Sequence, residues 1–485
     1  MTRASMSILS RDDIEQIHDA SVRILSEVGV KIESPSVLSL LGKAGAKLDE
    51  KRQHALLPER LVSDALRTAP KSIKICSRGG VDHTIPSEGV QLVSPDGQPP
   101  AVWDPNTCEK RPSTLKDVIE MSIVSDALPE VGHLWPPVIA TDMPAATSTL
   151  FEFLASLAYT SKHIQHGAIS AEEAEYQVKI GAAVLGSMEA LKKRPIFSDV
   201  CTPISPLRWD KGEVEALVVL SRAGIPMAQL SMGIAGSVTP VTVAGTMAIV
   251  NAENLCGLTM TQVAAQGAPS LYSSFSGVMD LKTGVFIGGT PEGVLMDCAA
   301  VQMARRYSLP TLCGGPGNSA RTLAAEAGSQ STMCTMGALL SGSDMLVGLG
   351  GMDRDGMVCL EKIVLDAEIW KWLVRVRNGI QVDAGTLGFD AIKRQGPAGL
   401  FMSDPHTVKY MRKELMIPQI TGFHDPKRAG YSFDDLLEYS KKKTKEILAT
   451  HKPKLLSADE AARVAAIAKK HGVVLSNGKQ IFEHE

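Results

Sequence analysis

Aromatic residues are scarce in this chain, at 5% of 485 residues, and the charged residues nearly cancel to a net charge of −3. So weak a charge imbalance gives no reason to expect binding to nucleic acid or to a membrane surface. The eight cysteines form no Cys-x-x-Cys pair and no cluster with histidine. A disulfide framework and a structural zinc site are therefore not expected, and the cysteines are interpreted as reduced, mostly buried side chains.

A long uninterrupted apolar run is also missing. The most apolar stretch, residues 241–265, is interrupted by four polar side chains: Asn251, Glu253, Asn254 and Gln262. Ionisable and amide groups near its middle argue against a membrane span and favour a buried helix. Residues 1–10 contain no apolar segment typical of a signal peptide, so we expect a cytoplasmic protein.

Short apolar runs alternate with longer helical segments from about residue 131 onward. Seven strands are predicted at residues 132–136, 163–168, 196–201, 227–232, 270–275, 311–314 and 345–348. Helices are predicted between them at residues 148–160, 171–191, 211–223, 241–266, 291–307 and 321–340. The spacing of about 30 to 45 residues between strands is typical of a (β/α)8 TIM-type barrel, whose eighth strand would lie before Gly132 or after Gly351. A doubly wound open sheet is the alternative, although neither a GxGxxG nor a GxxxxGK[ST] phosphate loop is present.

Three regions follow from this pattern. Residues 1–130 form an N-terminal helical and strand-rich extension, in which Ser10-x-x-Asp13 predicts a capping box. Residues 131–372 form the barrel and its catalytic core, and residues 373–485 form a C-terminal helical extension. We expect both extensions to pack on the barrel.

A series of short motifs is spread along the chain in a characteristic order. The motifs are SPL at 205–207, GIP at 224–226, GSVTPVTVAG at 236–245, NAENL at 251–255, GAPSLY at 267–272, MDLKTG at 279–284 and VLDAE at 364–368. In order and spacing the sequence resembles the trimethylamine methyltransferase superfamily over nearly its whole length. The resemblance implies a (β/α) barrel that moves a methyl group from an amine to the cobalt of a separate corrinoid protein.

The founding enzymes of that superfamily carry pyrrolysine, whereas this sequence contains only the twenty standard residue types and has a Gly-rich segment at 314–321. The chain therefore resembles the branch without pyrrolysine, which implies a quaternary amine as substrate. A cobalt(I) nucleophile that removes CH3 from a quaternary ammonium expels a neutral tertiary amine, so no acid or base is required. Positioning and desolvation suffice, and no catalytic residue is singled out.

The cobalt-ligating pattern Asp-x-His-x-x-Gly is absent, and the nearest approximation, at residues 404–409, lacks the glycine. We therefore expect the corrinoid (cobalamin) to arrive on a partner protein, with no cofactor held tightly by this chain. No metal site is expected on the chain itself.

A quaternary ammonium has no N–H, so recognition depends on aromatic ring faces through cation–π attraction. The aromatic residues at or near predicted strand ends are Trp135, Trp209, Tyr272 and Phe275. Tyr272 and Phe275 are an odd number of residues apart in an extended strand, so only one can face inward, and Tyr272 is preferred because it lies within the strand. Each of the four could instead fill the core.

The small pocket that these residues predict favours glycine betaine, whose carboxylate needs a binding group of its own. Arg321 and Asn318 follow a predicted strand end, and His166 lies at another. Two other functions stay open: a non-catalytic barrel that binds quaternary ammonium, and a barrel lyase, which would need an active lysine or a metal. A homo-oligomer is possible.

Overall fold

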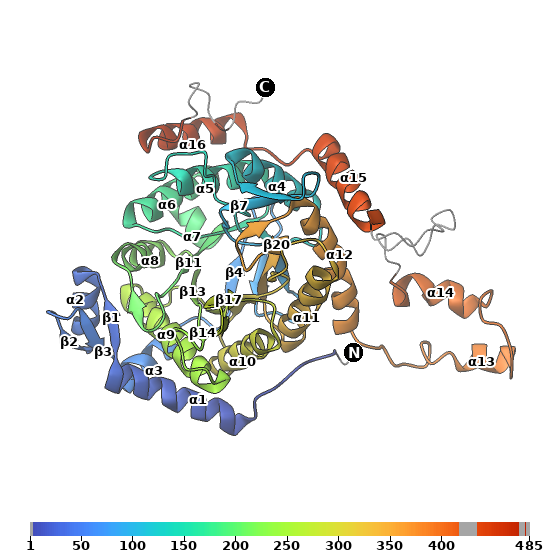
Figure 1. Ribbon diagram of the computed structural model, residues 1–485, viewed down its shortest axis with the longest axis horizontal. Helices are drawn as coiled ribbons and strands as arrows, with labels where there is room; N and C mark the ends of the chain where they lie inside the picture. Colours follow the sequence, from blue (N-terminus) through green and yellow to red (C-terminus); the bar gives the residue numbers. More distant parts are fainter. Residues whose placement is uncertain (1–2, 417–433, 475–480, 482–485) are drawn as a thin grey trace.

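A closed barrel of eight parallel strands forms the centre of the protein (Figure 1). The computed structural model describes residues 3–416, 434–474 and 481. The strands in chain order are β6 (Leu92–Pro95), β9 (His133–Leu134), β10 (His163–His166), β11 (Phe197–Cys201), β13 (Met227–Ser231), β15 (Ser270–Ser274), β18 (Thr311–Gly314) and β19 (Met345–Leu349). β19 pairs in parallel with β6, and the Gly132 N–H donates to the Val93 carbonyl at 2.9 Å, which closes the ring next to β9.

A ring of helices surrounds the strands, one main helix after each strand (Figure 1). These helices are α4 (Leu115–Ala127), α5 (Ser148–Tyr159), α6 (Ala171–Leu185), α8 (Lys211–Ala223), α9 (Val243–Ala264), α10 (Pro291–Tyr307), α11 (Ala325–Ser341) and α12 (Leu360–Arg377), with a short α7 (Met188–Lys193) after α6. Local sequence signals set their ends. The Thr114 hydroxyl and Asp117 form a capping box at α4, Pro291 opens α10, and Gly224 in a left-handed conformation ends α8.

The fold agrees with the predicted (β/α)8 barrel, and all seven predicted strands overlap observed ones. The eighth strand is β6, which lies before Gly132. The barrel therefore begins at Leu92, inside the range of residues 1–130 that the sequence pattern assigned to the N-terminal extension. The doubly wound open sheet is wrong, because the two end strands of the order, β6 and β9, are joined through the parallel bridge between Val93 and Val131, which leaves no open edge.

The N-terminal extension covers part of the outside of the barrel and the end of the barrel where its strands begin. It contains α1 (Arg11–Arg23), a π-helical turn (Ile24–Val28), β1 (Val30–Ile32), α2 (Pro35–Lys43), β2 (Lys47–Asp49), β3 (His54–Leu56), α3 (Glu59–Thr68), β4 (Ile73–Ile75) and β5 (His83–Ile85). The predicted capping box of Ser10 and Asp13 is present at α1. The β4–β5 hairpin closes the end of the barrel where the strands begin: Ile73 and Ile85 pack against inward-facing side chains of the barrel, and the Cys76 N–H donates to the Pro195 carbonyl just before β11.

Two small sheets stand at the other end of the barrel, where the strands finish. One has the order β20-β21-β7-β8 and contains β7 (Ala101–Asp104), β8 (Glu109–Pro112), β20 (Gly351–Met352) and β21 (Met357–Val358). The other consists of β14 (Ile234–Ala235), β16 (Gly277–Asp280) and β17 (Val285–Ile287). A further short strand, β12 (Arg208–Trp209), joins β1. Because these strands follow β6, β13, β15 and β19 directly, they form the rim of the barrel mouth.

The C-terminal extension contains α13 (Phe389–Gln395), α14 (Pro405–Glu414), α15 (Asp434–Thr450) and α16 (Ala458–Lys470). α15 contacts α12 and α4, and α16 contacts α6, whereas α13 and α14 lie away from the barrel (Figure 1). All eight cysteines are unpaired, and all but Cys108 are buried. No helix in the described part of the chain is long and apolar enough to cross a membrane; α9, predicted as a buried helix, packs between α8 and α10.

Candidate active site

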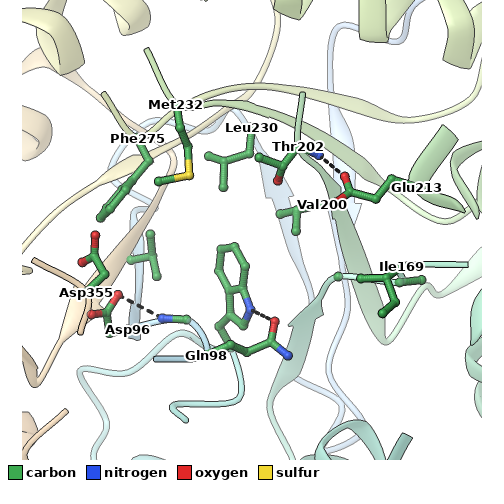
Figure 2. A pocket seen from close by; sticks show the side chains of 15 residues that line it. Asp96, Gln98, Ile169, Val200, Thr202, Glu213, Leu230, Met232, Phe275 and Asp355 are labelled. Atoms are coloured by element: carbon green, nitrogen blue, oxygen red, sulfur yellow. Dashed lines mark hydrogen bonds between the residues drawn. The ribbon is translucent and has the colours of Figure 1, made fainter. Parts of the chain in front are cut away.

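A cavity opens at the mouth of the barrel, where the carboxyl ends of the parallel strands meet (Figure 2). Its volume is about 760 Å³, including the space open to solvent. The lining residues are Asp96, Gly97, Gln98, Trp135, Gly167, Ala168, Ile169, Val200, Thr202, Glu213, Leu230, Met232, Phe275, Val347 and Asp355. Nearly all lie at or just after the ends of seven barrel strands. In (β/α)8 enzymes this face carries the active site.

Trp135 forms one wall of the cavity. It follows β9, and its indole Nε1–H donates to Gln98 Oε1 at 3.2 Å. The Gln98 amide in turn donates to Glu152 Oε2 at 2.7 Å, and Glu152 Oε1 accepts the Ala140 N–H at 2.9 Å. A Cβ at Gly97 would lie 2.7 Å from the indole ring, so the loop needs glycine there to let the ring approach. This chain of contacts fixes the orientation of the ring before any ligand binds.

Phe275 forms a second aromatic wall. It is the first residue after β15, and its N–H donates to the Ser231 carbonyl at 3.0 Å, which continues the pairing with β13. Alternate residues of a strand share a face, and Leu271 of β15 also packs inside the barrel. The ring of Phe275 therefore points inward and is half-buried on the cavity (Figure 2).

Two aspartates meet on one side of the cavity. Asp96 follows β6, and Asp355 lies in the turn between β20 and β21; Figure 2 shows their carboxyl groups turned toward each other. Asp96 Oδ1 accepts the Gly97 N–H at 3.0 Å, whereas the buried Oδ2 has no hydrogen bond of normal geometry to a described residue. Burial raises the pKa of Asp96 to about 6, although the Lys362 ammonium acts in the opposite direction. Burial and then repulsion from Asp96 raise the pKa of Asp355 well above its usual range.

Glu213 lies across the cavity, in the first turn of α8 (Figure 2). Its Oε2 accepts the Thr202 N–H at 2.7 Å. Burial raises the pKa of Glu213 to about 7, and the nearby Asp210 adds to the shift. The side chains that line the cavity thus include three carboxyl groups and no lysine, arginine or histidine. Such a site favours a cationic ligand and offers no fixed positive charge to an anion.

The structure places two of the seven predicted site residues, Trp135 and Phe275, on this cavity. Tyr272 points the other way, so the preference for Tyr272 over Phe275 is wrong. Its hydroxyl donates to Asn251 Oδ1 of α9 at 3.1 Å, and its ring stacks on Tyr307 of α10 with 6.3 Å between centroids. Residue 272 falls on the outward face of β15, where a large ring fills the space under the helices.

The other four predicted side chains also lie outside the cavity lining. Trp209 is fully buried beside Gly257 of α9. His166 faces the helices, where its Nδ1 is 3.1 Å from Gln177 Nε2 and its ring meets Phe153 edge-on.

Asn318 and Arg321, the other two residues assigned to a substrate carboxylate, are also outside the cavity lining. The Asn318 amide donates to Ser331 Oγ at 3.0 Å and is buried in its own loop. Arg321 is 72% exposed and pairs with Asp353 at 3.2 Å. A polar residue at a strand end reaches the mouth only if the backbone turns it inward, which the sequence pattern does not specify.

Five polar lining residues were not predicted: Asp96, Gln98, Thr202, Glu213 and Asp355. The dipeptide Asp96-Gly97 directly follows β6, the barrel strand that the sequence pattern did not locate. Recognition of β6 as a strand would have placed Asp96 and Gln98 at a strand end. Asp355 lies in a turn, with a φ of +60°, and nothing in the sequence around it indicates that it lies on the cavity.

A sequence profile of the trimethylamine methyltransferase (MTTB) family matches residues 1–473. The chain belongs to the trimethylamine methyltransferase family. It is 29% identical over 406 residues to trimethylamine methyltransferase MttB of Desulfitobacterium hafniense DCB-2, covering 84% of this chain and 82% of that one. It is 28% identical over 477 residues to the glycine betaine methyltransferase of D. hafniense Y51, covering 96% and 97%.

The fold of this trimethylamine methyltransferase family member is shared by the solved monomethylamine methyltransferase (MtmB) of Methanosarcina barkeri. The TM-score is 0.53 at 14% identity, covering 96% of this chain and 88% of the other. The resemblance noted from the sequence motifs is thereby confirmed, and the chain is a methyltransferase of this family.

In this family member, side chains of α11 and α12 bind the Gly-rich loop that follows β18. The Lys362 ammonium of α12 is buried and donates to Asp366 Oδ2 at 2.5 Å, to Ser331 Oγ at 2.9 Å and to the Pro316 carbonyl at 3.4 Å. Asn318 donates to the same Ser331 hydroxyl. A buried ion pair thus helps to fix the position of the loop.

Proposed function

We propose that this chain transfers a methyl group from a quaternary amine to the cobalt(I) of a separate corrinoid protein. The observation that carries the proposal is the combination, in one cavity at the barrel mouth, of two aromatic walls and three carboxyl groups without a cationic side chain. Ring faces and carboxylates attract a methylated ammonium that has no N–H to donate. Family membership and a relative named for glycine betaine support the same reaction.

The residues of the chain contribute position and desolvation. Trp135, held by Gln98, and Phe275 contact the methyl groups and orient one of them toward the open mouth. The partner's reduced corrinoid supplies the nucleophile that accepts the methyl group. Because the leaving group is a neutral tertiary amine, no side chain has to donate or accept a proton, and the buried walls exclude water from the reacting atoms.

The proposal covers quaternary amines as a class, with glycine betaine as the first compound to test. The relative named for that substrate supports it, although the three residues assigned to its carboxylate are not on the cavity. Among the alternatives, the lining offers no lysine for a Schiff-base lyase, and no group of three or more metal-ligating side chains occurs in the described ranges. A barrel that only binds quaternary ammonium would share the same lining. We also propose a cytoplasmic location and leave the oligomeric state to measurement.

Methyl-cobalt(III) formation is the decisive assay. The purified chain is mixed with a reduced corrinoid protein and with glycine betaine, choline, carnitine or proline betaine, and the absorbance change from cobalt(I) to methyl-cobalt(III) is followed. Formation with at least one compound, dependent on the chain, supports the proposal. If a quaternary amine binds but no compound forms methyl-cobalt with any of several corrinoid proteins, the result would refute methyl transfer and support a barrel that only binds quaternary ammonium.

A further inference from the structure

The carboxyl pair on one side of the cavity, Asp96 with Asp355, has no role in a reaction that needs no proton. Asp96 is 3% exposed, and its Oδ2 is an acceptor without a donor among the described residues. A buried carboxylate that lacks a partner is costly, and a functional site is where such a group is retained. The pair therefore needs an explanation beyond packing.

The basic side chains that flank the pair in the described structure make their ion pairs with other carboxylates, and none of them lines the cavity. Lys362 of α12 pairs with Asp366 at 2.5 Å. The three others converge on Asp353: Lys110 at 3.0 Å, Arg354 at 2.9 Å and Arg321 at 3.2 Å. The remaining titratable group on the cavity, Glu213, is itself acidic and lies on the far side.

The charge state of the pair follows from its burial. Asp96 is buried and Asp355 is partly buried, and two such carboxyl groups that face each other do not both ionise readily, so they share one proton and one negative charge. Burial raises the pKa of Asp96 only to about 6, whereas the pKa of Asp355 is raised well above its usual range. Near neutral pH the pair thus presents one negative charge to the cavity that Trp135 and Phe275 also line, and no cationic side chain of the lining pairs with it.

We infer that Asp96 and Asp355 select a quaternary ammonium monocation that carries no carboxylate, with choline as the type of ligand that fits. The inference rests on the proposed function and narrows its substrate class. A monocation neutralises the single charge of the pair and brings no negative charge of its own. A betaine brings its own carboxylate to a cavity without a cationic side chain, and binding then requires the uptake of a further proton.

Isothermal titration calorimetry on the full chain, without corrinoid, tests this selection. Choline is expected to bind about tenfold or more tightly than glycine betaine at pH 7.5, since an unfavourable buried charge of this kind costs at least that ratio. Choline affinity should rise between pH 5 and pH 7.5 as the pair loses a proton, and glycine betaine affinity should fall. Equal or tighter binding of glycine betaine at pH 7.5 would overturn the inference.

A double variant localises the effect. Asp96→Asn/Asp355→Asn removes the shared charge and should weaken choline binding about tenfold while narrowing the difference from glycine betaine. Either single change leaves one carboxyl group that ionises more readily without its neighbour, so the single variants should bind choline nearly as well as the wild type near pH 7.5. Asparagine tolerates the positive φ of residue 355, so the double variant tests the charge without backbone strain. Asp390→Asn, the same chemical change at an exposed site on α13, should leave both affinities unchanged. A folded double variant with wild-type choline affinity would refute the role of the pair.

The binding and transfer assays separate this inference from the proposed function. Methyl-cobalt formation from glycine betaine but not from choline would keep the proposed function and end the inference. Choline binding that depends on the pair of Asp96 and Asp355, with no methyl-cobalt from any compound, would keep the cation site and end the proposed methyl transfer.

Discussion

Replacement of Phe275 by leucine gives a direct test of the aromatic wall. Leucine keeps apolar bulk on the cavity but removes the ring quadrupole that attracts a quaternary ammonium. The ring is half-buried and faces the cavity from the end of β15, so a ligand cation can reach its face. A cation–π contact contributes roughly 0.5 to 2 kcal/mol, which corresponds to a rise of about two- to thirtyfold in Kd.

Tyr272→Leu is the matched control, because residue 272 is on the same strand but faces the helices. That change removes the hydrogen bond to Asn251 and the stacking on Tyr307, and should lower the free energy of unfolding by about 2 to 4 kcal/mol. The affinity of the folded fraction should stay at the wild-type value. Titration calorimetry with tetramethylammonium and urea denaturation measure the two quantities. Loss of affinity in Tyr272→Leu with none in Phe275→Leu would refute the assignment of the inward face.

Three further outcomes follow from the structure. Lys362→Met, which leaves Asp366 buried without its partner, should lower the free energy of unfolding by about 3 to 5 kcal/mol, and Lys362→Met/Asp366→Leu should recover most of it in urea denaturation. Burial lowers the pKa of His166 to about 4, so on acidification the unfolded chain takes up a proton before the folded chain does. The free energy of unfolding should therefore fall as the pH drops from 6.5 to 4. The His166→Gln variant should reduce this fall by roughly 1.4 kcal/mol per pH unit. Leu281→Asp, at a rim position that is 68% exposed, should slow methyl transfer to the corrinoid protein without changing amine affinity, whereas Met188→Asp on α7 should change neither. Equal rates for Leu281→Asp and the wild type would place the docking surface elsewhere.

The sequence pattern predicted the barrel because its strands are buried on both faces and are separated by long helices. It did not locate β6, since four residues followed by a turn resemble many loops and the segment lies outside the regular alternation. That omission also concealed Asp96 and Gln98, whose position depends on the strand before them.

The aromatic residues show a second limit of the sequence pattern. Position near a strand end does not distinguish the inward face from the outward one, and Trp209 and Tyr272 both fill space against α9. The face of a residue depends on where the strand starts, to within a single position. For β15 the sequence pattern predicted the strand correctly, but not which of its alternate residues face the interior of the barrel.

Closure of the barrel by β6 has a consequence for folding. Leu92 pairs with Met345, so a strand made early in synthesis has one neighbour that leaves the ribosome only after most of the barrel. Contacts this distant in sequence close large loops and slow the folding reaction. Until β19 has been synthesised, the unpaired edge of β6 can pair with strands of other chains. Because β6 is only a short strand, this risk is limited. A truncated chain ending before β19 should therefore aggregate in the absence of chaperones, and the last barrel strand decides when the protein becomes a single cooperative unit.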